Sequence, residues 1–148
     1  MREVFRTASE PDTIALGERL AARLAPGTVV ALTGQLGAGK TTLAKGIVRG
    51  LGAAEPDEVS SPTFTLIHEY GDPPRVYHVD LYRLDEAAET ESLGLEELFG
   101  RDAVVLVEWG ERFPELLPAR HAEIELRRLG EEEREIEFRA APAESPEE

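Results

Sequence analysis

Apolar residues along this chain follow two periods, one typical of strands and one typical of helices. The run from Thr28 to Thr33 is apolar and rich in β-branched residues, which predicts a buried parallel strand. Further along, apolar residues recur every four positions at Leu43, Ile47 and Leu51, which predicts the buried face of a helix. Five consecutive apolar residues, Ala103 to Val107, predict a second buried strand. This mixture is typical of an α/β fold.

Two pairs of β-rich segments flank turn sequences and predict antiparallel hairpins. The first pair, Phe64 to Tyr70 and Arg75 to Leu84, is joined by a Gly/Pro turn. The second pair, His121 to Leu129 and Arg134 to Arg139, alternates apolar and polar residues, as in a hairpin with one solvent face. Arg2 to Arg6 is a further candidate strand. The predicted fold is an α/β P-loop NTPase-like fold, with a mixed, mostly parallel sheet, flanking helices and antiparallel hairpins.

Helix-start signals predict two more helices. Ser9 is a candidate N-cap, with Asp12 at the capping-box position, and Pro26-Gly27 ends the predicted helix. Asp85 can cap an acidic helix that runs to about Phe99. Its carboxylates are interpreted as a solvated face, and a docking face for a basic partner is the alternative.

Length and composition limit the class of protein. The 148 residues suffice for one domain, predicted over residues 1–139, and residues 140–148 read as a disordered acidic tail. The sequence shows no membrane-spanning run and no signal-peptide region, so a cytoplasmic protein is expected. The absence of cysteine excludes a disulfide framework and a thiolate metal site.

The formal net charge of −14 bears on the choice of partner. Proteins that bind nucleic acids normally present basic patches to the phosphate backbone. A basic protein surface is therefore a more natural partner for this chain than free tRNA or DNA.

The segment from Gly34 to Thr41 (GQLGAGKT) fits the phosphate-binding motif G-x-x-x-x-G-K-[ST]. It lies between a predicted strand and a predicted helix, which is the order that the motif needs. Glycines let backbone N–H groups surround phosphate oxygens, and the helix N-terminus adds partial positive charge. Lys40 can reach the β- and γ-phosphates, and Thr41 can offer its hydroxyl to Mg²⁺. The alternative interpretation is a glycine-rich turn without a ligand.

Two carboxylates fall within or at the end of predicted strands. Glu108 follows the apolar run that ends at Val107, and ligands of open α/β sheets bind at the carboxyl ends of strands. Mg²⁺ would satisfy this otherwise costly buried carboxylate. Asp80 is a second candidate partner of a metal or of water. Thr63 is a candidate γ-phosphate sensor, although a plain loop is the preferred interpretation.

Four segments in this order resemble the TsaE family, also called YjeE: GQLGAGKTT, SPTFTLIHEY, YHVDLYRL and VEWGE. The resemblance spans about Ser9 to Phe138, and the second and third segments together are highly specific. It implies an ATP-binding and ATP-hydrolysing component of the bacterial machinery that makes N6-threonylcarbamoyladenosine in tRNA, next to the anticodon. In that family TsaE acts with a TsaB–TsaD pair, so tRNA is met only indirectly, through the complex.

The resemblance also implies roles for individual residues. Thr41 and Glu108 would bind Mg²⁺, and Ser9 and Arg134 match regions that border the adenine. Trp109 follows Glu108 in an EW pair of the family, which implies that its ring lies at the site. The residues that would hold the phosphates of ATP are Gly37, Ala38, Gly39, Lys40, Thr41 and Thr42.

Phosphoryl transfer depends on positioning and charge stabilisation. Lys40 would neutralise phosphate charge, and either Asp80, which resembles an essential acidic residue of the family, or Glu108 would orient the attacking water. No arginine is clearly placed as a finger, and Arg83 is the nearest in sequence to Asp80. Slow hydrolysis, stimulated by a partner, is therefore expected.

Three other functions are alternatives to this one. A small-molecule kinase shares the P-loop but would need a lid with clustered arginines, which the segments after the P-loop helix do not show. A GTPase would need an N/T-K-x-D motif, and the chain has no Asn and only two lysines, Lys40 and Lys45. A non-catalytic, nucleotide-dependent scaffold differs only in whether the γ-phosphate is hydrolysed.

Overall fold

The computed structural model describes residues 2–141 except residues 36, 61, 63–66 and 83–93. The described strands form one seven-stranded sheet in the order β1-β7-β6-β2-β5-β4-β3. The strands are β1 (Arg2–Thr7), β2 (Val29–Thr33), β3 (Ile67–Tyr70), β4 (Val76–Asp80), β5 (Val104–Glu108), β6 (Ala122–Arg128) and β7 (Arg134–Arg139). The helices are α1 (Glu10–Ala21), α2 (Lys40–Gly50) and α4 (Leu95–Phe99), and short 3₁₀ helices are η1 (Pro56–Glu58), η2 (Gly110–Arg112) and η3 (Pro114–Leu116).

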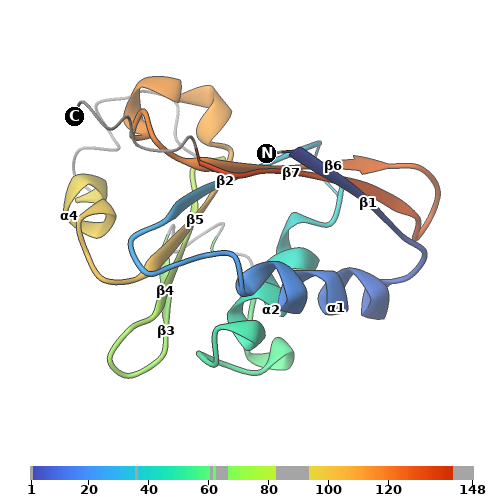
Figure 1. Ribbon diagram of the computed structural model, residues 1–148, viewed down its shortest axis with the longest axis horizontal. Helices are drawn as coiled ribbons and strands as arrows, with labels where there is room; N and C mark the ends of the chain where they lie inside the picture. The colour runs from blue at the N-terminus through green and yellow to red at the C-terminus, as the bar shows by residue number, and fades with distance from the viewer. Residues whose placement is uncertain (1, 36, 61, 63–66, 83–93, 142–148) are drawn as a thin grey trace.

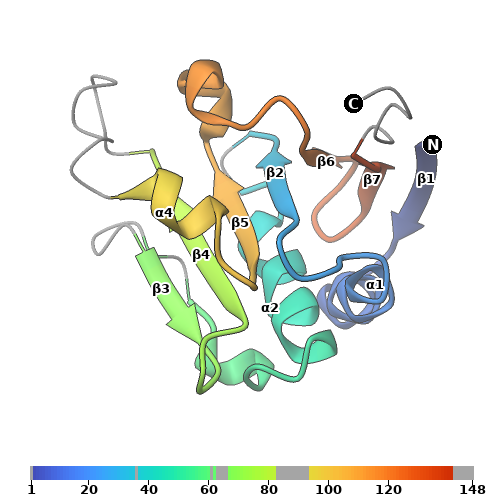
Figure 2. The same ribbon diagram turned by 60° about the vertical axis from the view of Figure 1, so that its left-hand side comes forward.

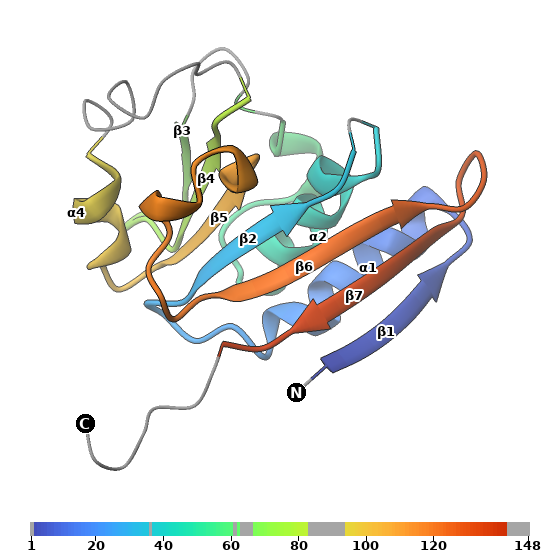
Figure 3. The ribbon, with the colours of Figure 1, turned by 90° about the horizontal axis from the view of Figure 1, so that it is seen from above.

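The sheet is mixed and mostly parallel, which confirms the predicted fold class. Strands β6, β2, β5 and β4 lie side by side and run parallel, as Figure 3 shows from above. The two predicted hairpins are confirmed as β3–β4 and β6–β7, and β1 adds an antiparallel edge next to β7. Because the central strands are parallel, the ends of β2, β4 and β5 and the β6–β7 turn meet at one edge of the sheet.

Helices α1 and α2 cover one face of the sheet, below it in Figure 1. The larger apolar core fills the space between this face and the two helices. Leu16 and Leu20 of α1 and Leu43 and Ile47 of α2 are at most 1% exposed, and they pack in one cluster with Leu106 of β5. The predicted four-residue period of α2 therefore marks its buried face correctly.

A smaller core occupies the opposite face over β4 and β5. Leu95 and Leu98 of α4 and Phe113 at the start of η3 pack there with Val79 and Val107. This cover reaches only part of the sheet, as Figures 1 and 2 show. Strands β4 and β5 are therefore buried on both sides, and side chains at their ends can be held away from bulk water.

Helices α1 and α2 touch each other through glycines. A Cβ atom at Gly46 would lie 2.0 Å from the carbonyl oxygen of Ile14, and one at Gly17 would lie 2.5 Å from that of Leu43. Gly50 is similarly close to Ala21. Figure 2 shows the two helices side by side. The absence of side chains at these positions lets the two backbones approach closely, which fixes the helix that follows the glycine loop.

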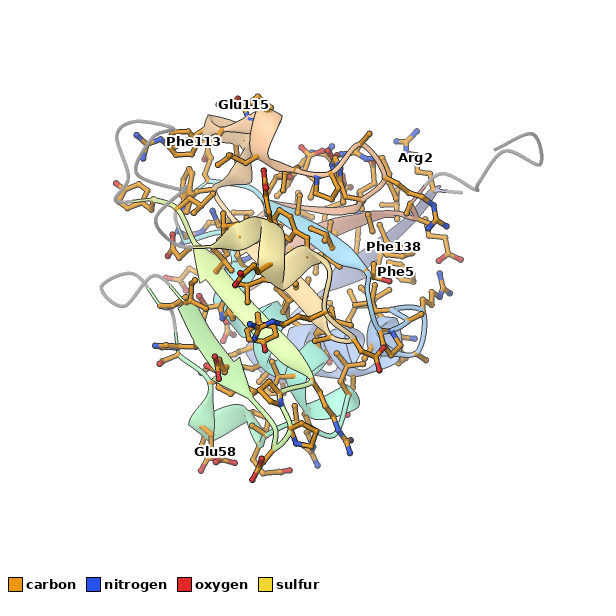
Figure 4. The ribbon with its side chains drawn as sticks, turned by 90° about the vertical axis from the view of Figure 1, so that its left-hand side faces the viewer. Arg2, Phe5, Glu58, Phe113, Glu115 and Phe138 are labelled. Carbon is orange, nitrogen blue, oxygen red and sulfur yellow. The ribbon has the colours of Figure 1, made fainter. Side chains whose placement is uncertain are left out.

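The half of the sheet made by β1, β7 and β6 carries charged residues on the face away from α1. Figure 4 shows Arg2 on the opposite side of β1 from Phe5 and Phe138. Glu137 is 2% exposed on this charged face and contacts Arg2, Arg127 and Arg139. Burial acts to raise the pKa of Glu137, but the hydrogen bond and charge of Arg2 and the charges of the other two arginines outweigh it, so this pKa lies below its ordinary value.

Three predicted bounds of elements were wrong. The acidic helix predicted from Asp85 to about Phe99 does not run unbroken through Gly94, which has a left-handed φ of 69°, so α4 begins at Leu95. Helix α1 ends at Ala21 rather than at Pro26-Gly27, because the N–H groups of Arg23 and Leu24 turn to carbonyls only three residues back. Strand β4 ends at Asp80 rather than at Leu84, because the Asp80 side chain accepts the N–H of Tyr82 at 2.8 Å and turns the chain.

Other predictions fall outside the described residues or were tested directly. Thr63, Arg83 and the helix cap Asp85 lie outside the described residues, as do residues 64–66 of the first predicted hairpin and residues 142–148. Ser9 is confirmed as the N-cap of α1, since its side chain accepts the N–H of Asp12. None of the helices in the described part of the chain has the length and hydropathy of a membrane span.

Candidate functional site

The glycine loop joins the end of β2 to the start of α2, as the motif requires. Its three glycines Gly34, Gly37 and Gly39 have φ values of 141°, 80° and 103°, which only glycine adopts without strain. A Cβ atom at Gly34 would also lie 2.5 Å from the carbonyl oxygen of Leu126 on β6. The loop is therefore packed closely against the neighbouring strand, and Lys40 is the first residue of the helix.

Lys40 points back into the loop and not into solvent. Its Nζ donates a hydrogen bond to the carbonyl oxygen of Gly34 at 2.8 Å and lies 3.5 Å from the centre of the Trp109 ring. Burial lowers the pKa of Lys40, while the charges of Glu108, Glu111 and Asp80 act in the opposite direction. The ammonium group therefore stands between the loop and a group of carboxylates.

Asp80 and Glu108 end neighbouring parallel strands and are paired in register. Each is 3% exposed, and both side chains lie on the α2 face of the sheet, where Val76 and Leu106 also point. The structure thus brings the two carboxylates predicted from the sequence to the same edge as Lys40. Asp80 also accepts the backbone N–H of Tyr82, which fixes the orientation of its side chain.

His78 holds Glu108 from the neighbouring strand. It is fully buried on β4, two residues before Asp80 and on the same face. Its Nε2 contacts Oε2 of Glu108, whereas its Nδ1 has no hydrogen-bond partner among the described residues. We therefore assign the tautomer in which Nε2–H donates to the carboxylate. One oxygen of Glu108 is oriented by this bond.

Trp109 forms a wall of the site. Its φ of 65° is the one positive φ of a non-glycine residue in the described ranges, a conformation that costs about 1–3 kcal/mol. This turn directs the ring against Lys40 and to 5.0 Å from the ring of Tyr82. The strained backbone places an aromatic surface beside the loop, where the family resemblance implied it.

These side chains surround a cleft of about 430 Å³ at the edge of the sheet. The cleft is lined by Gly37, Gly39, Lys40, Thr41, Thr42, Asp80, Tyr82, Glu108, Trp109 and Arg134. A second hollow of about 280 Å³ shares three of these residues and lies between the start of α1 and the β6–β7 turn. It is lined by Glu10, Thr13, Gly39, Thr42, Glu131, Glu132 and Arg134.

Comparison with known proteins places the chain in a family. The family model described as threonylcarbamoyl adenosine biosynthesis protein TsaE matches residues 7–136. The chain belongs to the TsaE family. The tRNA threonylcarbamoyladenosine biosynthesis protein TsaE of Bacillus subtilis (strain 168) is 45% identical over 137 residues, which cover 92% of this chain and 84% of that protein. The protein of the same name from Treponema pallidum (strain Nichols) is 41% identical over 136 residues, covering 92% and 98%.

The family assignment extends to the fold. The crystal structure of YdiB from Bacillus subtilis matches this chain with a TM-score of 0.76 and 38% sequence identity. The match covers 96% of this chain and 87% of that one. Both the resemblance to TsaE and the predicted fold class are thereby confirmed.

The residues of this TsaE-family site fit a magnesium ion that is shared with phosphates. Thr41 at the start of α2 and the buried Glu108 both line the cleft, with Asp80 beside them. No group of three or more His, Cys, Asp or Glu side chains that could hold a metal occurs within the described ranges. Mg²⁺ commonly takes only one or two carboxylates and completes its shell with water and phosphate oxygens. The donor set therefore suits a metal that arrives with a nucleotide.

The sequence of this TsaE-family chain did not reveal one residue of the site, and for another it indicated only the part of the site in which that residue lies. The sequence pattern singled out Asp80 but not His78, although the two-residue spacing between them puts both side chains on one face of the strand. The resemblance implied only that Arg134 lies in a region that borders the adenine, and in the structure Arg134 lines both hollows. Ser9 caps α1, but the second hollow is lined by its neighbours Glu10 and Thr13.

Proposed function

We propose that this member of the TsaE family binds ATP with Mg²⁺ in the cleft and hydrolyses it slowly on its own. In this proposal it acts with a TsaB–TsaD pair and supports turnover of the machinery that makes N6-threonylcarbamoyladenosine in tRNA. In this proposal the chain contacts tRNA only indirectly, as part of that complex. Membership of a family named for threonylcarbamoyl adenosine biosynthesis supports the pathway.

One observation carries the nucleotide part of the proposal. The glycine loop, the Lys40 ammonium and the two buried carboxylates Asp80 and Glu108 converge on one cleft, although they come from three different strand ends. A positive group, loop N–H groups and buried carboxylates in one cleft are the parts that phosphoryl transfer requires. Other uses of a glycine turn do not call for this combination.

Each residue then has a distinct task. The loop from Gly37 to Thr42 binds the phosphates, and Lys40 exchanges its bond to the Gly34 carbonyl for phosphate oxygens. Thr41 and Glu108 would hold Mg²⁺, which would supply positive charge against the phosphates. Asp80 or Glu108 orients the attacking water. Because His78 already fixes one oxygen of Glu108, the other oxygen is the one offered to the metal or the water.

The second hollow is the proposed place of the adenosine. It opens from the phosphate cleft at Gly39 and Thr42, so a nucleotide could extend from one to the other. In this proposal Arg134 lines the passage, and Ser9 contributes through the first turn of α1, which it caps. The hydrolytic role distinguishes the proposal from a small-molecule kinase and from a non-catalytic scaffold.

Replacing Glu108 with glutamine is expected to remove most of the effect of Mg²⁺ on ATP binding. The amide keeps the shape and can still accept the bond from His78, but it loses the charge that a hard cation prefers. We expect the ratio of ATP affinities in Mg²⁺ and in EDTA to fall about tenfold, the size of one charge-assisted interaction. Thr41→Ala is expected to act in the same direction. Isothermal titration calorimetry measures both affinities.

The matched control for this experiment is Glu111→Gln. Glu111 also acts on Lys40 through its charge but is exposed and does not line the cleft. It should leave the dependence on Mg²⁺ close to that of the unmodified chain. If Glu108→Gln retains the full effect of Mg²⁺, the metal role of Glu108 is wrong.

The proposed function is tested by ATP hydrolysis with and without partners. Among the described residues that line the cleft, the one arginine is Arg134, and its guanidinium is bonded to backbone carbonyls. An arginine finger can contribute 10³–10⁵ in rate, so the chain alone should be slow and a partner should accelerate it. Addition of TsaB–TsaD should raise the rate, and added salt should weaken the association if the net charge of −14 drives the encounter.

Free tRNA provides the contrasting arm of that experiment. With the net charge of this chain, tRNA alone should have little effect on hydrolysis. Strong stimulation by tRNA, with none from TsaB–TsaD, would overturn both the partner and the charge argument. Phosphate transfer to a small acceptor in place of water would favour a kinase.

A further inference from the structure

Arg134 joins the glycine loop to the β6–β7 turn. Its Nε donates to the carbonyl oxygen of Ala38 at 2.9 Å, and Nη2 lies 3.5 Å from that of Gly37. On the other side, Nη1 reaches three carbonyl oxygens of the turn, those of Gly130 and Glu131 at 3.1 Å and of Glu133 at 2.9 Å. One guanidinium therefore binds two segments that are almost a hundred residues apart in the sequence.

The bond to Ala38 has a consequence for the next amide. In a trans peptide the C=O of one residue and the N–H of the following residue point in opposite directions. When Arg134 holds the Ala38 carbonyl on its own side, the N–H of Gly39 is turned to the other side of that peptide plane. Gly39 has φ 103°, so its backbone has other conformations open to it and does not fix this orientation alone.

We propose that Arg134 is a positioning residue that presets the Gly39 amide for phosphate binding, and that its main role is not contact with the base. This inference rests on the proposed nucleotide site and deepens it. In the absence of Arg134, the Ala38–Gly39 peptide must be ordered when the ligand binds, which lowers affinity. The positive charge behind the loop adds to the effect.

Arginine suits this task better than lysine. Its planar guanidinium carries five N–H donors in fixed directions, enough to serve both the loop and the turn at once. A lysine would keep the charge but has a single ammonium at the end of a flexible chain. Arg134→Lys should therefore restore only part of what Arg134→Ala loses.

The control residue lies six positions away on β6. Arg128 donates from its Nε to the same Gly130 carbonyl at 3.0 Å, but it makes no hydrogen bond to the described residues of the glycine loop. Arg128→Ala removes a positive charge and a bond to the turn while leaving the Ala38 carbonyl held. Comparison of the two variants separates the effect on the loop from a general effect on the hairpin.

The first measurement compares ATP with inorganic tripolyphosphate, which has no base or ribose. Calorimetry on Arg134→Ala should show about a tenfold loss of affinity for both ligands, the size of one bond to a charged group. Arg128→Ala should stay within about twofold of the unmodified chain. A loss for ATP alone would show that Arg134 contacts the base and would overturn the proposal, as would unchanged affinity for both.

The second measurement is amide hydrogen exchange in the nucleotide-free protein. Exchange in a peptide that covers Gly34 to Thr41 should be faster in Arg134→Ala than in the unmodified chain and in Arg128→Ala, because the hydrogen bond from Arg134 to the Ala38 carbonyl is lost. Unchanged exchange together with weaker binding would mean direct phosphate contact and would also overturn the proposal. If Arg134→Ala does not fold, Arg134→Gln, which keeps donors, and Arg134→Lys carry the same comparison. Failure of the unmodified chain to bind ATP would instead count against the proposed function.

Discussion

Replacing Lys40 with methionine is expected to lower the rate of ATP hydrolysis about 10²–10³-fold without unfolding the protein. This is the usual cost of removing one preorganised group that stabilises transition-state charge. Lys40 is 4% exposed, and in such a poorly hydrated place a charge acts on phosphate more strongly than it would in water. Methionine keeps an unbranched apolar stem of similar length, so the space beside Trp109 stays filled.

The expected stability of Lys40→Met follows from the pKa of the lysine. Burial lowers that pKa, which means that the folded chain disfavours the charged form relative to solvent. Removal of the ammonium relieves this cost, and the loss of its bond to the Gly34 carbonyl acts in the other direction. The melting temperature should therefore change little.

Lys45 supplies the control, because it is the other lysine of the chain and lies on the same helix. Lys45→Met should leave hydrolysis close to that of the unmodified chain, and circular dichroism should show both variants folded. If a folded Lys40→Met variant binds and hydrolyses ATP as the unmodified chain does, the proposed phosphate-binding role of the glycine loop and Lys40 is wrong.

Replacing Gly46 with alanine is expected to destabilise the fold by roughly 3 kcal/mol or more. Helix propensity alone predicts the opposite sign, a gain of about 1 kcal/mol for alanine over glycine inside a helix. At Gly46, however, the new methyl carbon would lie 2.0 Å from the carbonyl oxygen of Ile14. A backbone atom cannot move aside as a flexible side chain does, so α1 and α2 must separate and open the larger core.

Thermal or denaturant unfolding measures this effect, and Gly100→Ala is the matched control. At Gly100 the nearest atom to an added Cβ would be 3.7 Å away, so ordinary van der Waals contact results. For a chain of this size a loss of 3 kcal/mol corresponds to roughly 6–12 °C in melting temperature. A Gly46→Ala variant as stable as the control would show that the helix contact is much looser than the structure indicates.

The sequence by itself determined the features that depend on neighbouring residues. The glycine loop, the strand before it and the helix after it are all specified within about twenty residues, and each was predicted correctly. The same holds for the Ser9 cap and for the β6–β7 hairpin, whose register follows from its alternation and its turn. Glu108 was placed near the loop because strand ends in parallel sheets share one edge.

Ends of elements were determined less well, because a side chain can redirect the backbone. The apolar pattern favoured a strand through Leu84, but the Asp80 carboxylate captures the N–H of Tyr82 and ends β4 early. This bond is local, and it forms where Asp80 is paired in register with Glu108 at the edge of the sheet.

Only the tertiary structure decided which distant residues touch. His78 meets Glu108 across thirty positions of sequence, and Arg134 meets Ala38 across ninety-six. The backbone of α1 at Ile14 approaches Gly46 so closely that a Cβ at Gly46 would lie 2.0 Å from the Ile14 carbonyl oxygen. Hydrophobic period reveals which face of an element is buried, but it contains no information about which element lies opposite. Strand order and helix packing supply that information, and they bring His78 to Glu108 and Arg134 to the glycine loop.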